Sequence, residues 1–341
     1  MEMCVWSAYA GNQSAAPLLW ESLRKIEGIW GGYYTGLVTM DGNGLHWEKC
    51  VGCTEVWQQK YHLDDFPGCA GLIHSRTASG GDANRAHPFV GADGVVALVS
   101  QGSTGIFKDN VEKFTACGNS MLVRGRKCRS AIPEEAARSF VLTDGTRASM
   151  SDIVVNAVEE HYLAHGDPVA AMKTVCGSLP EESATIFLFR DRPGFIGFVN
   201  VNQHVVCNFE EHSVWLSVTS LGVPGYAMEI PGNSVGFVTA DGEFRRERLT
   251  ENYPPIDTRI PEKALPAFRA AIKENPGLTL GKLCDIAVSP LFGHRSLEYR
   301  AVTAYRMLET LAAAGGIRFE PGLVPGWKDV PGRIFTIHSA E

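Results

Sequence analysis

Cys4 combines position and residue type in a way that could do chemistry, in the opening segment Met1-Glu2-Met3-Cys4. If the three preceding residues are removed, or if translation starts at Met3, Cys4 becomes the N-terminal residue and carries a thiol and an α-amine together. An unperturbed α-amine titrates near pH ~7.7–8.0, so it can accept the thiol proton at neutral pH. Nucleophiles activated by their own terminal amine occur in amide hydrolysis. We expect the working form to begin at Cys4; the alternative is a small apolar residue near a terminus.

A second candidate group follows the strand-like segment that begins at Gly71. Arg76 ends this segment, and its planar guanidinium suits a carboxylate. Thr77 and Ser79 lie in the small-residue loop that follows, where backbone can approach a ligand closely. His87 comes next, before Pro88. We interpret these residues as substrate-binding, the alternatives being a surface ion pair for Arg76 and a structural turn for His87.

Two further segments carry polar groups at the ends of expected elements. Gln101 and Gly102 follow the strand-like Val99-Ser100, and an amide donor beside a backbone N–H is what an oxyanion hole requires. Asp152 opens a helix that Ser149 or Ser151 would cap, and its carboxylate could bind an ammonium group. The alternatives are an ordinary strand end and an ordinary helix-start acid.

The nine cysteines do not form an obvious disulfide framework in a chain of this length. Cys50 and Cys53 have CxxC spacing, but no second ligand pair follows at the spacing of a zinc site. A redox CxxC would open a helix, and no clear helix is expected here. We interpret the pair as structural or incidental, and we expect neither a metal nor a cofactor.

Composition limits the classes of function that remain. A chain of 341 residues with 45% hydrophobic and 20% charged residues is long enough for two globular domains. Its net charge of −7 argues against coating nucleic acid or an anionic membrane. No apolar run approaches the ~18–20 residues of a membrane span, and the N-terminus lacks a signal-peptide layout. The expected location is the cytoplasm.

Hydrophobic periodicity predicts a layered α+β domain over the first 250 residues. Helices are expected over 15–29, 150–163 and 168–178. A strand over 33–40 runs into the turn at 41–44, and further strand-like segments follow at 71–75 and 94–100. Between 184 and 244 we expect five short strands separated by Gly, Pro, Asp and Asn.

The composition changes at the proline-containing stretch 251–263, which we predict to be a linker. Residues 264–341 then read as three helices and a β-hairpin, the pattern of a winged-helix-like domain. Residues 257–341 hold 11 Lys and Arg against 9 Asp and Glu, a net charge of +2, although Arg295, Arg300 and Arg306 lie on or near the third helix. Because DNA affinity needs several neutralised phosphates, we favour docking or dimerisation of this domain over DNA binding.

The order of these motifs resembles the glutaminase domain of the class II glutamine amidotransferases, which are N-terminal nucleophile (Ntn) hydrolases, as in glucosamine-6-phosphate synthase. That family begins Met-Cys-Gly-Ile, and this chain has Met3-Cys4-Val5-Trp6. The family's His-Thr-Arg-Trp-Ala-Thr-His-Gly and Ala-His-Pro are similar to His74–Gly81 and Ala86–Pro88. Its His-Asn-Gly-Ile and Ser-Glu-Thr-Asp are similar to Ser100–Gly102 and Ser149–Asp152.

The resemblance implies a fold and a set of roles. Residues 4–250 would form a four-layer αββα Ntn-hydrolase sandwich, with Cys4 attacking the side-chain amide of glutamine to give a thioester, ammonia and then glutamate. The site residues implied, in chain order, are Cys4 as nucleophile, Arg76 for the α-carboxylate, Thr77 and Ser79 beside it, His87, Gln101 and Gly102 for the oxyanion, and Asp152 for the α-amino group.

Departures from the family pattern leave the substrate open. Gln101 stands where the family has asparagine, and Thr77 where it has tryptophan. The chain is therefore expected to be a glutaminase-type hydrolase or a Cys4-dependent hydrolase of another amide. A third hypothesis is a weakly catalytic glutamine-binding regulator that acts through the C-terminal domain. The family implies an ammonia-accepting synthase, which would be a separate partner protein here, and a homo-oligomer is also compatible with the sequence.

Overall fold

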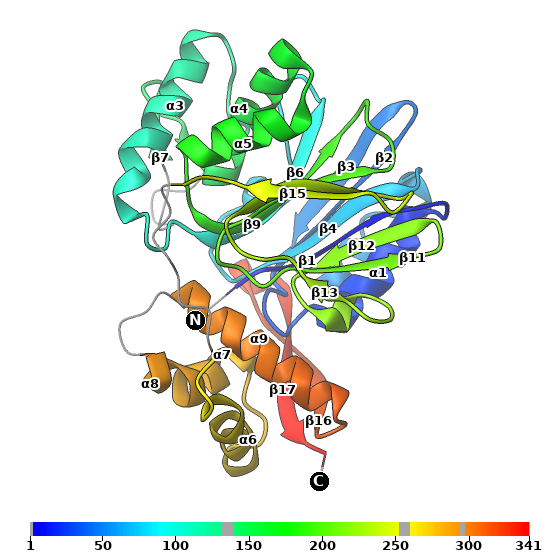
Figure 1. Cartoon of the computed structure of the whole chain (residues 1–341), viewed down its shortest axis with the longest axis vertical. Helices are drawn as coiled ribbons and strands as arrows, with labels where there is room; N and C mark the ends of the chain where they lie inside the picture. Colours follow the sequence, from blue (N-terminus) through cyan, green and yellow to red (C-terminus); the bar gives the residue numbers. More distant parts are fainter. Residues whose placement is uncertain (1–2, 131–139, 252–259, 293–296, 341) are drawn as a thin grey trace.

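Two antiparallel sheets form the centre of the computed structural model, which describes residues 3–130, 140–251, 260–292 and 297–340 (Figure 1). The first sheet has the strand order β13 (Met228–Glu229), β11 (Val206–Glu210), β12 (Ser213–Ser217), β1 (Val5–Ala10), β4 (Ala70–Arg76), β2 (Tyr34–Asp41) and β3 (Gly44–Val51). The second has the order β15 (Phe244–Arg248), β14 (Ser234–Thr239), β10 (Phe195–Asn200), β9 (Glu182–Phe189), β6 (Val96–Ser103) and β5 (Phe89–Val90).

Helices cover the outer faces of both sheets. Helix α1 (Ala15–Ile26) packs on β1 and β4 of the first sheet. On the second sheet, α4 (Met150–His165) packs on β6 and α5 (Pro168–Ser178) on β10, with α3 (Val111–Val123) against α4. The short β7 (Phe140–Val141) and β8 (Arg147–Ala148) pair beside them. The expected mixture of helices and sheets is confirmed.

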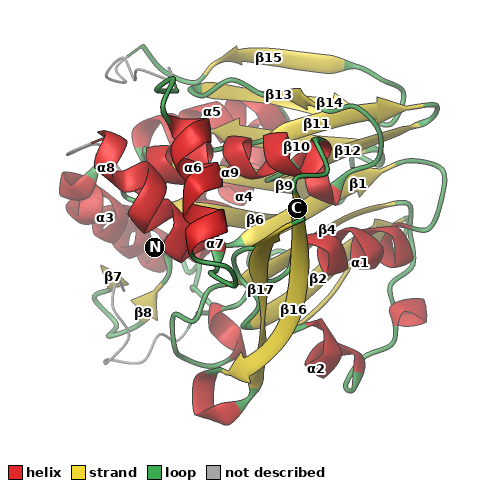
Figure 2. Ribbon diagram, turned by 90° about the horizontal axis from the view of Figure 1, so that it is seen from below, coloured by secondary structure: helices red, strands yellow, loops and turns green. Residues whose placement is uncertain are grey.

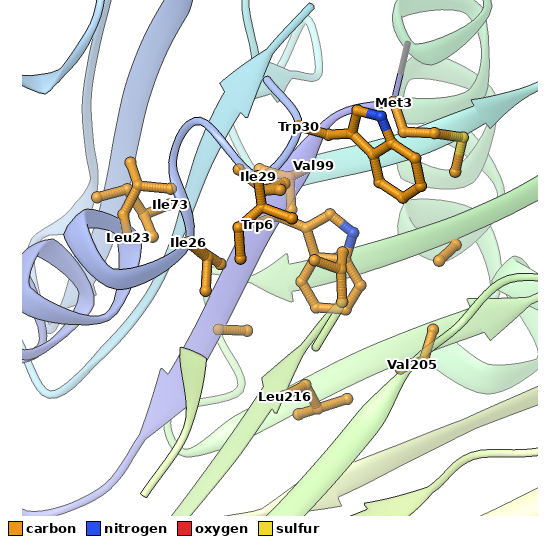
Figure 3. Close-up of a cluster of buried hydrophobic side chains, with 14 of the residues drawn as sticks. Met3, Trp6, Leu23, Ile26, Ile29, Trp30, Ile73, Val99, Val205 and Leu216 are labelled. Atoms are coloured by element: carbon orange, nitrogen blue, oxygen red, sulfur yellow. The ribbon is translucent and has the colours of Figure 1, made fainter. Parts of the chain in front are cut away.

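The inner faces of the sheets share one hydrophobic core. Trp6 of β1, Val99 of β6 and Phe198 of β10 are fully buried in it. Figure 3 shows Met3, Trp6 and Trp30 at the start of β1, and all three belong to this core. A second core, which includes Ile153, lies between the outer face of the second sheet and helices α3 to α5.

The C-terminal segment belongs to the first core. It contains α6 (Ala264–Glu274), α7 (Leu280–Leu283), the π-helical turn η5 (Cys284–Val288), α8 (Ser289–Phe292), α9 (Leu297–Ala313) and the hairpin β16 (Ile317–Pro325) and β17 (Pro331–Ser339). Phe268, Tyr305 and Leu308 are fully buried in the same cluster as Trp6. Helices followed by a hairpin match the predicted order, and the winged-helix assignment stays a prediction. Most of the predicted linker, 252–259, and Arg295 lie outside the described residues.

A charged network joins α9 to the first sheet. The buried ring of His204 contacts Glu309 of α9 at 3.0 Å and Glu229 of β13 at 3.4 Å. Glu309 also accepts hydrogen bonds from Thr219 Oγ1 at 2.6 Å and from the Ser220 N–H at 2.7 Å. Arg306 of α9 pairs with Glu229 at 2.5 Å. Arg306 therefore faces the sheet, which makes it unsuited to a DNA contact.

This network makes stability depend on pH in a defined direction. Burial would lower the pKa of His204, but hydrogen bonds to Glu229 and Glu309 raise it to about 9. Because this exceeds the unfolded value of ~6.5, the contribution of His204 is complete below pH ~6.5 and is lost as pH rises through about 9. Burial opposes ionisation of Glu229 too, yet the bond to His204 lowers its pKa to about 2, so its contribution is lost only as pH falls toward that value.

We predict that His204→Gln removes the fall in unfolding free energy between pH ~6.5 and ~9. In the unsubstituted chain this fall is on the order of 2 kcal/mol, because one buried imidazolium loses its proton. Urea unfolding across this range measures it. His62→Gln, at an exposed position, is the control and should keep the slope. Equal slopes in the chain and in His204→Gln would contradict the prediction.

The C-terminal hairpin docks on the segment after α1. The Phe335 N–H donates to the Gly28 carbonyl at 2.7 Å, and the Arg333 N–H donates to the Gly32 carbonyl at 2.8 Å. Gly32 has a φ of +95°, and a Cβ there would lie 1.9 Å from the Arg333 carbonyl oxygen. Only glycine allows this close backbone approach.

Gly32→Ala is expected to destabilise the chain by about 2–4 kcal/mol, because it combines a strained φ with a clash against β17. Gly42→Ala, where an added Cβ meets nothing within 4 Å, should change stability by no more than about 0.5 kcal/mol. Denaturant unfolding of both variants measures the difference. A Gly32→Ala variant as stable as Gly42→Ala would show that β17 is not tightly docked.

Among the described residues, no helix has the length and apolar character to cross a membrane.

Candidate active site

The pairing of β1 with β4 brings Cys4 and Arg76 to the same end of the first sheet. The two strands are antiparallel, with Val5 opposite Ser75 and Trp6 opposite His74. One step further along this register, Cys4 faces Arg76, and both are half-buried. Burial lowers the pKa of Arg76, and the charge of Cys4 acts in the opposite direction, which places the two side chains within electrostatic range.

A second arginine fixes the loop that follows Arg76. The Arg76 guanidinium donates to the Arg85 carbonyl oxygen. The Arg85 Nη1 donates in turn to the carbonyl oxygens of Ser79 at 2.7 Å and Gly80 at 3.0 Å. The Ser79 N–H donates to the Thr77 carbonyl at 2.7 Å, so loop 77–81 has a defined turn next to Arg76. Thr77 and Ser79 thus lie in a turn that Arg85 links to the Arg76 guanidinium.

A pair of buried histidines links the first sheet to the remaining candidates. His74 of β4 contacts the Ser100 carbonyl of β6 at 3.0 Å, directly before Gln101. His87 contacts Ser151 Oγ at the start of α4, also at 3.0 Å. The two imidazole rings lie 4.2 Å apart between centroids. Their contacts therefore tie together the ends of β4, β6 and α4.

Both histidines are held neutral. Burial and, to a lesser extent, the charge of Arg76 together lower the pKa of His74 to about 3. Burial and the neighbouring His74 also hold the pKa of His87 well below its usual range. Neither imidazole can therefore serve as a base that titrates near neutral pH.

We predict that the imidazole of His74 shows no titration between about pH 5 and pH 8, since its pKa lies near 3. Nitrogen NMR of histidine-labelled protein, assigned with His74→Gln, measures this. The imidazole of His204, whose pKa is near 9, should stay protonated over most of the same range. A His74 resonance that moves across this range would contradict the assignment.

Gln101 and Gly102 lie at the end of β6, paired with Ala184 and Ser183 of β9. The Gln101 side chain is buried, and its Nε2 donates to Gln203 Oε1 at 3.2 Å. Gly102 has a φ of +126°, and a Cβ there would lie 2.1 Å from the Glu182 carbonyl oxygen. The extra methylene of Gln101 is thus accommodated by a bond to Gln203, and one Nε2 hydrogen remains for another acceptor.

Asp152 is fully buried at the start of α4, which Ser149 caps by accepting from the Asp152 N–H at 3.1 Å. One carboxylate oxygen accepts from the Ser130 N–H at 2.5 Å, and the other accepts from Asn156 Nδ2 at 3.0 Å. Burial raises the pKa of Asp152, against the effect of these hydrogen bonds and of Lys49. In this arrangement Asp152 holds local structure, and a ligand would share its oxygens with those donors.

Three residues near the site escaped sequence reasoning. Lys49 donates to the carbonyls of Ala86 and Pro88 at 2.8 and 3.2 Å, and burial lowers its pKa to about 8. Gln203 holds Gln101. Neither Lys49 nor Gln203 belongs to a recognisable motif, so the sequence alone does not indicate that they lie near the site.

Tyr305 of α9 is the third, and it comes from the C-terminal segment. Its ring packs edge-on against Trp30 at 4.8 Å, and its buried hydroxyl finds no hydrogen-bond partner among the described residues. Burial raises its pKa well above the usual value, and the charge of Cys4 adds to this effect. The C-terminal segment therefore reaches the neighbourhood of Cys4.

A pocket of about 330 Å³ lies between the C-terminal segment and the residues that follow α1 and β4. It is lined by Gly28, Ile29, Trp30, Gly31, Tyr33, Thr77, Thr279, Gly281, Lys282, Asp285 and Ile334. Thr77 directly follows Arg76, so the pocket adjoins the candidate site, although neither Cys4 nor Arg76 lines it.

The CxxC segment differs in one respect from expectation. A helix, α2 (Thr54–Gln58), does follow it, with Cys53 as the N-cap residue. Five residues are too few to show a helical period, which is why the sequence did not predict this helix. Burial raises the pKa of Cys50 to about 11 and that of Cys53 to about 12, so both thiols stay protonated, as befits a structural pair. The described residues contain no group of three potential metal ligands.

Comparisons with known proteins indicate which enzymes the chain resembles. No family model matches the chain. The glutamine–fructose-6-phosphate aminotransferase of Caldanaerobacter subterraneus is 24% identical over 197 residues, which are 57% of this chain and 28% of that enzyme. The enzyme of the same name from Streptomyces coelicolor is 27% identical over 220 residues, 63% of this chain and 31% of that enzyme.

A solved structure of glutamine phosphoribosylpyrophosphate amidotransferase from B. subtilis superposes with a TM-score of 0.57 at 13% identity. The match covers 93% of this chain and 66% of that one, and it shows a shared fold. The chain resembles the class II glutamine amidotransferases. The amidotransferase resemblance expected from the motifs is thus confirmed, although the chain spans only 28–31% of the length of these two curated relatives.

Proposed function

We propose that this chain hydrolyses the side-chain amide of glutamine with Cys4 as nucleophile, in a four-layer Ntn-hydrolase fold. The observation that supports the proposal is the register of β1 and β4, which brings positions 4 and 76 together at one end of the first sheet. A thiol and a carboxylate-binding fork at one sheet end suit a substrate with an amide and a carboxylate. The resemblance to enzymes named for glutamine-dependent transfer supports this choice.

In the proposed reaction the Cys4 sulfur attacks the amide carbon of glutamine. The free α-amine of Cys4 takes the thiol proton and passes it to the leaving nitrogen, so the carbon–nitrogen bond breaks and ammonia leaves. A water molecule then attacks the thioester, with the same amine as base. The carbon–sulfur bond breaks, glutamate leaves and the thiol is restored.

The other polar groups have proposed roles around these steps. Arg76 binds the α-carboxylate, with Thr77, Ser79 and His87 shaping that end of the site. The remaining Nε2 hydrogen of Gln101 and the N–H of Gly102 stabilise the oxyanion. Asp152 binds the α-amino group, sharing its oxygens with Ser130 and Asn156.

The amine needs a free N-terminus. While Met3 precedes Cys4, the nitrogen of Cys4 belongs to a peptide bond and cannot act as a base. We therefore propose that the active form begins at Cys4, which intact mass measurement tests directly.

The C-terminal segment has a proposed role as a docking or dimerisation unit of winged-helix type. The ammonia is proposed to pass to an ammonia-accepting synthase.

Incubation of the Cys4-first form with glutamine is expected to release glutamate and ammonia in equal amounts. Cys4→Ala should abolish release, and a glutamine-like diazo ketone should add its mass to Cys4 alone. Cys69→Ala, at an exposed cysteine, is the matched control and should keep full activity. Absence of turnover and of labelling in a form shown to begin at Cys4 would refute the proposal.

Arg76→Lys is expected to raise the KM for glutamine roughly tenfold or more, with a smaller change in kcat. An ammonium cannot reproduce the two parallel bonds of a guanidinium to a carboxylate. Arg245→Lys, at a largely exposed position, controls for the charge-conserving change itself. Steady-state kinetics with glutamine measures both variants. An unchanged KM in Arg76→Lys would place the carboxylate elsewhere.

The pocket beside Thr77 favours a second candidate, which is hydrolysis of a larger amide by the same Cys4 chemistry. Its volume of about 330 Å³ exceeds what an ammonia leaving group needs, and its walls combine Trp30 and Tyr33 with Lys282. A substituted amine on the glutamine side chain would fit there. A panel of glutamine and its N-substituted side-chain amides separates the two candidates by their kcat/KM values.

A further inference from the structure

The tip of the C-terminal hairpin lies on the loop that follows Arg76. Trp327 occupies this tip, in the short turn Trp327–Asp329 between β16 and β17. A Cβ built on Gly80 would lie 2.9 Å from Cζ3 and 3.3 Å from Cε3 of Trp327. The six-membered ring of the indole therefore packs directly over the backbone of Gly80, whose φ is +71°. Figure 2 shows the hairpin as a long curved pair of strands that extends away from helices α6 and α9.

The tip that carries Trp327 forms a hydrogen-bonded turn. The Gly326 N–H donates to the Val330 carbonyl at 2.9 Å, and Lys328 and Asp329 adopt left-handed φ values of 51° and 62°. Non-glycine residues adopt such values only where the surroundings enforce them. The indole is therefore presented to the loop by a turn of defined geometry.

The same tip also packs beside Arg76. A Cβ built on Gly332 would lie 2.5 Å from Tyr33 Cδ1, so the hairpin backbone lies directly on this aromatic ring. The Tyr33 N–H donates to the Arg76 carbonyl at 2.9 Å. The hairpin thus contacts Tyr33, whose N–H binds the Arg76 carbonyl, and it also contacts Gly80 in the loop that follows Arg76.

Arg85 clamps the loop on its other side. It donates to the Ser79 and Gly80 carbonyls, and its own carbonyl accepts from the Arg76 guanidinium. A continuous set of contacts therefore runs from the Trp327 ring through Gly80 and Arg85 to Arg76. Movement of the loop would disturb the group that faces Cys4.

We propose that Trp327 is a positioning residue for the amide site, a role that rests on the proposed function. Its ring holds loop 77–81 against Arg85 and so keeps the Arg76 guanidinium in the geometry that receives the substrate carboxylate. Cys4 is fixed independently, because the pairing of β1 with β4 and β12 holds it. Loss of the ring should therefore weaken substrate binding without changing the intrinsic reactivity of the thiol.

Three variants of the full chain test this role: Trp327→Ala, Trp327→Phe and, as control, Leu323→Ala. Leu323 lies in β16 of the same hairpin and is 61% exposed. Trp327→Ala should raise the KM for glutamine roughly tenfold with a smaller change in kcat, as expected when a contact remote from the reacting atoms is lost. Trp327→Phe should recover most of the affinity, and Leu323→Ala should behave like the parent chain.

Two readouts distinguish positioning from general damage. Alkylation of Cys4 by iodoacetamide, which needs no carboxylate site, should keep its rate in Trp327→Ala, whereas labelling by the glutamine-like diazo ketone should slow. Hydrogen exchange of the peptide that contains residues 77–81 should accelerate in Trp327→Ala and not in Leu323→Ala.

The exchange measurement also separates this inference from the proposed function. If the parent chain does not turn over glutamine, faster exchange of loop 77–81 in Trp327→Ala still supports the positioning role. Exchange equal to that of Leu323→Ala overturns it, whatever the kinetics. A KM in Trp327→Ala within about twofold of the parent value, in an active enzyme, also overturns it.

Discussion

The backbone pairing of β1 is the constraint on which the rest of the structure depends. This strand lies between β4 and β12, and each of its six residues is buried. Because side chains alternate between faces, a slip of one residue would turn Trp6 away from the space between the sheets, toward α1, and would move Cys4 away from the end of β4. The position of the thiol is thus set by hydrogen bonds between strands and by the large side chain two residues later.

The C-terminal segment is part of this arrangement. Phe268 and Leu308 share a core with Trp6, His204 and Glu309 form a charged link, and β17 lies on Gly28 and Gly32. Such a boundary resembles the interior of one domain more than a loose contact between two. It also explains why the neighbourhood of Cys4 and Arg76 contains residues from both ends of the chain.

Local patterns in the sequence were enough to predict many of the helices and strands. Helix α1, the β2–β3 hairpin and α4 with its Ser149 cap follow from periodicity, turn residues and capping preference. Helix α3 was missed because weak helix formers, among them Gly118, interrupt it; Gly118 is small enough to pack against Leu142.

The residues of the candidate site also fall into two groups, those that the sequence predicts and those that it does not. Arg76, Gln101 and Asp152 end or begin elements and could be found by motif. Gln203, Tyr305 and Trp327 matter through contacts with residues far away in the chain, and a single sequence carries no record of such contacts. The bond between Gln101 of β6 and Gln203, in the connection between β10 and β11, shows this best, since it explains the longer amide only once the two segments are seen together.

The place of β1 in the middle of its sheet also has a consequence for biosynthesis. The hydroxyls of Ser7 and Ser217 meet across 210 residues of chain, and β17, which covers Gly28 and Gly32, is made later still. Strand β1 therefore has one partner nearby in the chain, β4, and a second, β12, about 200 residues further on, and pairing over the longer separation is slow. A chain cut before β12 would carry Cys4 on an incomplete sheet, with one edge of β1 unpaired.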